Sequence, residues 1–244
     1  MGIYAVWGPP QSGKTTLAID LAFALSAHNQ SVLLISTEQY SELSARLNTQ
    51  IQHENSLAAA YKAKDTLQQI VHKVDDLLFV LAQPAQADVF GEDLTEETAQ
   101  WVIRQAEMLF DVVLIDCTSH TGSVLSAWGL SSAEKVFMMC GASSTALMWN
   151  TAYRRAVDVV EGKTVHIAAE VTESFDYRTL YTVQDIEPDY WLPYFPNADT
   201  VQLLKRTLYR SNGKAGKAYT KAIHALCEML TGKEEDEEDE HFDL

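Results

Sequence analysis

The N-terminal region contains a loop whose residue types and spacing are suited to binding phosphate. Residues 8–15, GPPQSGKT, match the pattern G-x-x-x-x-G-K-[ST]. Gly8 and Gly13 stand where a Cβ would obstruct the close approach of the backbone to an anion. Successive N–H groups from Gln11 to Thr16 are therefore expected to form an anion-binding nest, assisted by the dipole of the following helix.

Side chains of the same loop have separate predicted roles toward a nucleotide. Lys14 is expected to reach the β- and γ-phosphates, and the hydroxyl of Thr15 to bind Mg²⁺. Thr16 is expected to contact the α-phosphate, and Ser12 lies within the nest. An apolar run at residues 3–7 precedes the loop and a helical pattern follows it, which is the context that the motif requires. The loop predicts ATP with Mg²⁺ as ligands, with GTP as the alternative nucleotide.

Two acidic residues follow other apolar runs of the chain. Asp116 ends the run at 112–115, and an acid at the carboxyl edge of a buried strand faces a phosphate crevice. It is predicted to hold Mg²⁺ directly or through water, the alternative being a residue that caps the strand. Glu38 follows the strand-like run at 32–35 and is expected either to orient the attacking water or to be a surface residue that starts the next helix. Lys14, Glu38 and Asp116 form the predicted catalytic set.

Apolar runs of strand length alternate with helical patterns along most of the chain. The expected strands cover residues 3–7, 31–35, 76–82, 112–115, 135–140, 164–169 and 191–194. The expected helices cover residues 15–27, 40–47, 57–74, 95–110, 144–161, 199–209 and 216–230. This alternation predicts an α/β fold with a doubly wound, mostly parallel sheet flanked by helices.

Composition predicts one P-loop domain over residues 1–232 and an acidic, disordered tail over 233–244. The chain has 244 residues, of which 47% are hydrophobic, enough for one sizeable core. The formal net charge is −16, and the tail contributes −7 of it, with eight Asp or Glu and one Lys. So acidic a chain is expected to repel nucleic acid, and no direct nucleic-acid binding is predicted. The apolar runs are too short to span a bilayer and the N-terminus does not resemble a signal peptide, which favours a cytoplasmic location.

The most basic region lies near the C-terminus. Its cations are Lys205, Arg206, Arg210, Lys214, Lys217 and Lys221. It is interpreted as a solvated helix face, the alternative being a docking patch for an acidic partner or for the chain's own tail. The three cysteines, Cys117, Cys140 and Cys227, are far apart in the sequence and are expected to be reduced, buried thiols.

Taken together, these motifs resemble the ParA/MinD-like P-loop ATPases, from Gly2 to about Leu230. The resemblance rests on residues 8–16, FDVVLID at 110–116, EKVFMMC at 134–140 and LPY at 192–194. Within that group the chain looks most like the TadZ/CpaE-type ATPases of pilus assembly and secretion systems. The resemblance implies slow ATP hydrolysis, a nucleotide-dependent homodimer, a protein partner, and a role in positioning or assembling a larger cellular machine.

The chain departs from the family's pattern at several positions near the phosphates. The family has a second lysine directly after the first glycine of the loop, where this chain has Pro9. Aspartates are usual in the family where Ser36 and Glu38 stand. The loop after Asp116 lacks the usual proline, and Thr118 or Ser119 is expected to sense the γ-phosphate there. These departures weaken the expectation of hydrolysis.

A further departure concerns the nucleotide base. An Asn that reads adenine in the family is replaced here by Ala169-Glu170, which leaves open whether the nucleotide is ATP or GTP.

Two other functions stay in consideration beside the ATPase. One is a nucleotide-binding scaffold with little or no hydrolysis. The other is a small-molecule kinase, for which Arg154, Arg155 and Arg178 are the candidate lid arginines.

Overall fold

A single eight-stranded sheet forms the centre of the computed structural model, which describes residues 2–60, 66–84, 94–120 and 122–231. The strands are β1 (Gly2–Trp7), β2 (Val32–Ser36), β3 (His72–Lys73), β4 (Leu78–Leu81), β5 (Val112–Asp116), β6 (Lys135–Cys140), β7 (Thr164–Ala169) and β8 (Tyr190–Leu192). Their order is β3-β4-β2-β5-β1-β6-β7-β8, and every pair is parallel except β3 with β4. The predicted doubly wound, mostly parallel α/β fold is confirmed.

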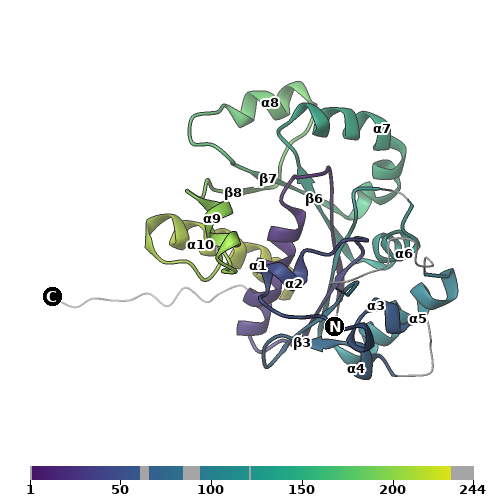
Figure 1. Cartoon of the computed structure of the whole chain (residues 1–244). Helices are drawn as coiled ribbons and strands as arrows, with labels where there is room; N and C mark the ends of the chain where they lie inside the picture. The colour runs from purple at the N-terminus through teal and green to yellow at the C-terminus, as the bar shows by residue number, and fades with distance from the viewer. Residues whose placement is uncertain (1, 61–65, 85–93, 121, 232–244) are drawn as a thin grey trace.

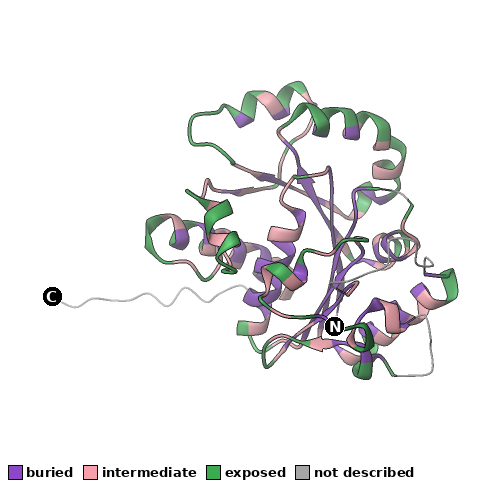
Figure 2. Ribbon diagram, in the orientation of Figure 1, coloured by how far each residue is buried: buried purple, intermediate pink, exposed green. Residues whose placement is uncertain are grey.

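Helices cover both faces of this sheet (Figure 1). They are α1 (Lys14–Ala27), α2 (Leu43–Arg46), α3 (Leu57–Ala60), α4 (Leu67–Ile70), α5 (Glu96–Leu109), α6 (Val124–Ser132), α7 (Ser144–Val160), α8 (Tyr177–Val183), α9 (Ala198–Leu203) and α10 (Gly213–Thr231), with 3-10 turns η1 (His53–Asn55) and η2 (Glu161–Lys163). One apolar core lies between the sheet and α1 with α10, and a second lies between the opposite face and α3 to α7. The central strands β1, β2 and β5 are therefore wholly buried and α1 is mostly buried, whereas α7 and α8 expose their outer sides (Figure 2).

The parallel register brings the functional loops to one edge of the sheet. In the pairing of β5 with its two neighbours, Asp116 stands opposite Val6 of β1 and Ser36 of β2. All three strands run in the same direction, so the phosphate loop, the segment after Ser36 and the carboxylate of Asp116 meet at their carboxyl ends. The central strands are apolar on both faces because helices cover both sides, as the uninterrupted hydrophobic runs indicate.

The start of α5 shows how local sequence sets a helix boundary. The Oγ1 of Thr95 accepts a hydrogen bond of 3.2 Å from the N–H of Thr98, and Glu96 and Glu97 lie in the first turn. Such a cap is worth about 1 kcal/mol to a helix. The predicted start of this helix is confirmed.

The predicted helix over 57–74 is wrong. Of its described residues, 57–60 and 67–70 form α3 and α4, whereas Val71 turns extended and β3 pairs antiparallel with β4, His72 opposite Val80. Ladder hydrogen bonds at the sheet edge override the helical pattern there. The predicted helix over 199–209 is also too long, since α9 ends at Leu203 and Lys205 has a φ of 58°. Helices α6 and α8 were not predicted, and residues 85–93, between the expected strand at 76–82 and the expected helix at 95–110, lie outside the described part.

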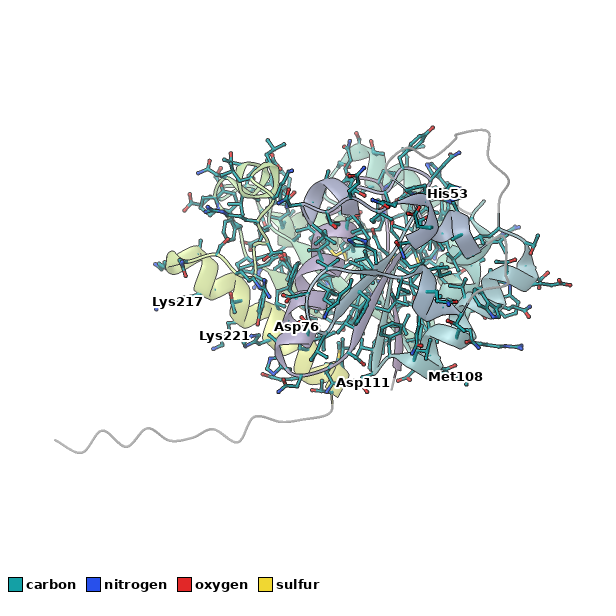
Figure 3. All side chains as sticks on the ribbon, turned by 60° about the horizontal axis from the view of Figure 1, so that its bottom comes forward. His53, Asp76, Met108, Asp111, Lys217 and Lys221 are labelled. Carbon is teal, nitrogen blue, oxygen red and sulfur yellow. The ribbon has the colours of Figure 1, made fainter. Side chains whose placement is uncertain are left out.

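The surface of α10 carries three of the six basic residues noted in the sequence. Lys214, Lys217 and Lys221 are exposed, and Figure 3 shows the last two pointing away from the body. The predicted tail over 233–244 lies outside the described residues. Among the described helices, none is both long and apolar enough to span a bilayer. The three cysteines are free and buried, and burial raises the pKa of each thiol to about 12.

Candidate nucleotide-binding site

An open cleft of about 910 Å³ lies at the carboxyl edge of the sheet. Its lining includes residues 11–16 of the phosphate loop, Ser36, Glu38 and Asp116 at the ends of β2 and β5, and residues 192–195 and 197–199 at and after the end of β8. Binding clefts for small ligands usually measure about 300–1,000 Å³. The cleft therefore has the size for a nucleotide, with the predicted phosphate-binding residues at its base.

The backbone of the loop has the geometry that an anion nest requires. Gly8 has a φ of 142°, and a Cβ there would lie 2.6 Å from the carbonyl oxygen of Met139. Gly13, with a φ of 93°, is the N-cap of α1, and Gln11 is left-handed with a φ of 59°. Alternating backbone conformations of this kind direct consecutive N–H groups into one concavity. The loop thus places free N–H groups and the positive end of a long helix at the same point.

The ammonium group of Lys14 lies inside the loop. Its Nζ donates to the carbonyl oxygen of Pro9 at 3.1 Å and to the Oγ of Ser119 at 2.7 Å. The residue is 7% exposed. Burial lowers the pKa of Lys14, while the negative charges of Asp116 and Glu38 act in the opposite direction. These acceptors hold a charged donor in position where the loop N–H groups converge.

Asp116 and Thr15 form a pair beside the loop. The Oγ1 of Thr15 donates to the Oδ2 of Asp116 at 2.8 Å. The Oδ1 of Asp116 is buried and has no hydrogen-bond partner within the described residues. Burial raises the pKa of this carboxyl to about 7, against the hydrogen bond from Thr15 and the charge of Lys14. An orphaned carboxylate oxygen beside a threonine hydroxyl suits Mg²⁺, which prefers oxygen ligands.

No group of three or more His, Cys, Asp or Glu side chains suited to a metal occurs in the described part of the chain. Mg²⁺ does not need one, because it usually takes one or two protein ligands and completes its shell with water and substrate phosphates. Thr15 and Asp116 are therefore an adequate protein contribution to a nucleotide-bound ion.

Glu38 lines the cleft and is half-buried. It is not the first residue of a helix, since α2 begins at Leu43. The segment before it is fixed, because the Oγ1 of Thr37 accepts from the N–H of Thr118 at 2.8 Å and donates to the carbonyl oxygen of Asp116 at 3.2 Å. The loops after β2 and β5 are thus tied together at the phosphate end of the cleft.

Two tryptophans hold the loop after β5, and the sequence pattern did not indicate them. The Nε1 of Trp7 donates to the carbonyl oxygen of Thr118 at 3.1 Å, and the Nε1 of Trp149 donates to that of Ser119 at 2.7 Å. The rings of Trp7 and Trp149 lie edge to face, 5.1 Å apart. Ser119 also donates from its Oγ to the carbonyl oxygen of Gly8 at 2.8 Å. Trp7 is adjacent in the sequence to the phosphate loop, but nothing in the sequence placed either tryptophan beside the loop after β5.

The other side of the cleft contains the residues expected near the base. Ala169 and Glu170 line it together with the LPY segment at 192–194. The Oε2 of Glu170 accepts a weak hydrogen bond of 3.4 Å from the N–H of Tyr194. The described lining includes none of the three candidate kinase arginines, Arg154, Arg155 and Arg178, but it does include an arginine that the sequence did not single out, Arg46.

Asp20 is a buried carboxyl group in α1, one turn beyond the loop. It is 1% exposed, its Oδ1 accepts from the N–H of Tyr209 at 3.2 Å, and no hydrogen bond to its Oδ2 is found within the described residues. Burial raises the pKa of Asp20 to about 7, although the N–H of Tyr209, the hydroxyl of Tyr219 and the charge of Arg46 oppose the shift. The carboxylate form therefore costs free energy in the folded state.

The variant Asp20→Asn is expected to be more stable than wild type at neutral pH, by up to about 4 kcal/mol. The pKa of Asp20 is higher in the folded chain than its ordinary 3.8, so wild-type stability falls as pH rises from about 4 to 7. The asparagine does not titrate, so its advantage should vanish toward about pH 4. Urea unfolding of both proteins across this range measures the difference. Parallel pH profiles would contradict the burial cost.

Comparison with known proteins defines the class of this fold and site. A family model described as an AAA domain matches residues 11–164. No curated protein sequence matches the chain significantly. Among solved structures, MinD from Pyrococcus horikoshii in complex with Mg-ADP has a TM-score of 0.73 at 16% identity, covering 96% of this chain and 100% of that one.

Two further solved structures are similar over nearly their whole length. A MinC:MinD complex from Aquifex aeolicus has a TM-score of 0.73 at 14% identity, covering 95% of this chain and 96% of that one. A ParA family ATPase from Chlorobium tepidum has a TM-score of 0.71 at 18% identity, covering 94% and 98%.

The fold and the phosphate loop together are those of a P-loop nucleoside triphosphatase. The chain belongs to the AAA domain family whose model it matches, with the fold of the ParA/MinD-like ATPases, and the predicted resemblance to that group is confirmed. None of these comparisons distinguishes the TadZ/CpaE type, which stays a prediction.

Proposed function

We propose that this protein is a ParA/MinD-type ATPase that binds ATP with Mg²⁺, hydrolyses it slowly and changes its association with partners between nucleotide states. The observation that carries the proposal is the convergence of Lys14, the Thr15–Asp116 pair and the free N–H groups of the loop at the base of one cleft. A polyanion with a divalent cation is the ligand that this combination suits.

Each residue at the base of the cleft has a role in this proposal. Lys14 exchanges its contacts with Pro9 and Ser119 for the β- and γ-phosphates, since charged oxygens are stronger acceptors than a carbonyl or a hydroxyl. Thr15 and Asp116 hold Mg²⁺, which when bound neutralises charge on the phosphates. Glu38 orients the attacking water, and Ser119 responds to the γ-phosphate because it loses the hydrogen bond from Lys14.

The similar structures support the choice of ligand and the type of partner. MinD from Pyrococcus horikoshii is complexed with Mg-ADP, and MinD from Aquifex aeolicus is complexed with the protein MinC. We extend both to this chain as proposals: an adenine nucleotide with Mg²⁺, and a protein partner bound in one nucleotide state. The homodimer and the role in positioning or assembling a larger machine rest on the family resemblance alone.

Phosphate release and molecular mass, measured for wild type with ATP or GTP and Mg²⁺, test the proposal. Wild type is expected to release phosphate slowly from ATP and to gain mass toward a dimer. The variant Glu38→Ala is expected to lower turnover by about tenfold or more while keeping ATP bound, because the water loses its orienting group. It should therefore retain the ATP-bound dimer longer than wild type does.

The other two functions are distinct outcomes of the same experiment. Tight ATP binding without phosphate release or a change in mass would replace the ATPase proposal by the scaffold, which the uncharged Pro9 favours. Phosphoryl transfer to an added small molecule would point to a kinase, although Arg178 is engaged elsewhere, 5.5 Å over the ring of Trp191.

A further inference from the structure

Arg46 lies at the end of α2 and lines the nucleotide cleft. One nitrogen of its guanidinium donates to the Oγ1 of Thr16 at 3.3 Å, and the other pairs with the Oε2 of Glu42 at 3.3 Å. The side chain is 15% exposed, whereas that of Glu42 is 65% exposed. An arginine is thus held at the side of the phosphate loop by one long hydrogen bond and one solvent-exposed ion pair.

The charge balance of the cleft makes this arginine important for binding an anion. The acidic residues in the described lining are Glu38, Glu42, Asp116, Glu170 and Asp199. The lysines and arginines in the same lining are Lys14 and Arg46. A polyphosphate entering a cleft with this excess of carboxylates is repelled, so each cation in it contributes strongly to binding. Lys14 serves the β- and γ-phosphate end, which leaves Arg46 beside Thr16.

We propose that Arg46 is a phosphate-binding residue of this site, supplying from within the same chain a second positive charge at the α-phosphate. The inference rests on the proposed nucleotide-binding function, which places the α-phosphate at Thr16. A guanidinium binds a phosphate through a planar fork of N–H donors, and a phosphate oxygen is a stronger acceptor than the hydroxyl of Thr16. In its ion pair the Glu42 side chain is 65% exposed and screened by water, so the pair is weak and can be exchanged for a nucleotide.

The position of Arg46 also has a purely structural explanation, and the experiment must distinguish it from phosphate binding. Through Thr16 the side chain links α2 to α1, through Glu42 it pairs with the N-cap of its own helix, and its charge opposes the rise in the pKa of the buried Asp20. Removing Arg46 could then weaken binding by loosening the wall of the cleft. Variants that change charge and the ion pair independently distinguish the two roles.

The affinities of wild type and Arg46→Gln for ADP and ATP, each with Mg²⁺, are measured by titration calorimetry. Arg46→Gln is expected to weaken both nucleotides by a similar factor of about 10 to 100, because both contain the α-phosphate and a charged hydrogen bond is lost. Arg46→Lys, which keeps the charge but not the fork, should lose less. Equal affinities of Arg46→Gln and wild type would overturn the inference.

Glu42→Gln is the matched control for the structural role. It breaks the same ion pair but leaves the guanidinium in place and removes one negative charge from the cleft, so it is expected to bind ADP and ATP more tightly than wild type. If the ion pair only braces α2, Glu42→Gln should bind more weakly, like Arg46→Gln, and the inference fails. Melting temperatures show whether each variant is folded, and Glu42→Gln decides the matter if Arg46→Gln is not.

The same titrations distinguish a failure of the proposed function from a failure of the role given to Arg46. If wild type binds neither ADP nor ATP, the proposed function is wrong. If wild type binds both and the Arg46 variants bind equally well, the nucleotide site stands and only the role of Arg46 is wrong.

Discussion

Lys14→Ala is expected to lower the affinity of this protein for ATP by about 100-fold or more. The lysine is buried and its Nζ is held between the carbonyl oxygen of Pro9 and the hydroxyl of Ser119, so no other side chain can easily replace it. Truncation removes the positive charge that would face the β- and γ-phosphates. The former acceptors stay hydrogen-bonded, since the carbonyl oxygen of Pro9 also accepts from the Oγ of Ser12 at 2.9 Å and the Oγ of Ser119 donates to Gly8. Titration calorimetry with ATP and Mg²⁺ measures the loss.

Lys163→Ala is a suitable control for this variant. The Nζ of Lys163 also donates to two carbonyl oxygens, those of Ser131 and Ala133 at 2.8 Å each, but the residue lies outside the described lining of the cleft. It should lose some stability and keep its affinity for ATP. If Lys14→Ala bound ATP as well as wild type does, the phosphate loop would not be the nucleotide site.

Asp116→Asn is expected to lower phosphate release by about 100-fold and to remove most of the effect of Mg²⁺ on ATP affinity. An amide beside Thr15 neutralises Mg²⁺ far less well than a carboxylate. The same change should leave the melting temperature of the nucleotide-free protein equal to that of wild type or higher. It removes a buried carboxyl group, and burial raises the pKa of that group to about 7. Steady-state phosphate release with increasing Mg²⁺ and a thermal melt test the two parts.

Asp111→Asn is the control for Asp116→Asn and is expected to change stability rather than the response to Mg²⁺. Asp111 precedes β5, at the other end of the same strand, and its Oδ2 accepts from the N–H and the Oγ of Ser31 at 2.9 and 2.6 Å. Those hydrogen bonds lower the pKa of Asp111, so its carboxylate stabilises the fold. Asp111→Asn should therefore lose stability and retain the dependence on Mg²⁺. Equal turnover in Asp116→Asn and wild type would exclude Asp116 from the site.

The sheet was predictable because its strands are buried on both faces. Runs such as those at 112–115 and 136–140 are apolar throughout, and the loop at 8–15 has a local pattern that does not depend on the rest of the chain. The edge of the sheet was less predictable. Residues 72–73 form a strand only because β4 lies beside them, and a partner in space cannot be read from a local helical pattern.

The cleft was only partly predictable for the same reason. Lys14, Thr15 and Asp116 follow from a motif and a strand end, which are local features of the sequence. Arg46 reaches Thr16 from a short helix and Trp149 reaches Ser119 from the second turn of α7, both through tertiary packing. No spacing rule in the sequence connects Arg46 with Thr16 or Trp149 with Ser119, so only the structure shows these contacts.

The hydrogen bonds from Trp7 and Trp149 have an optical consequence. The emission of an indole depends on the hydrogen bond that its N–H makes, and both of these N–H groups bond to the short segment Thr118–Ser119. That segment in turn receives the ammonium of Lys14. Two of the five tryptophans of the chain are therefore hydrogen-bonded to the segment that contains Ser119, the residue proposed to respond to the γ-phosphate, so intrinsic tryptophan fluorescence is expected to report occupancy of the site without an added label.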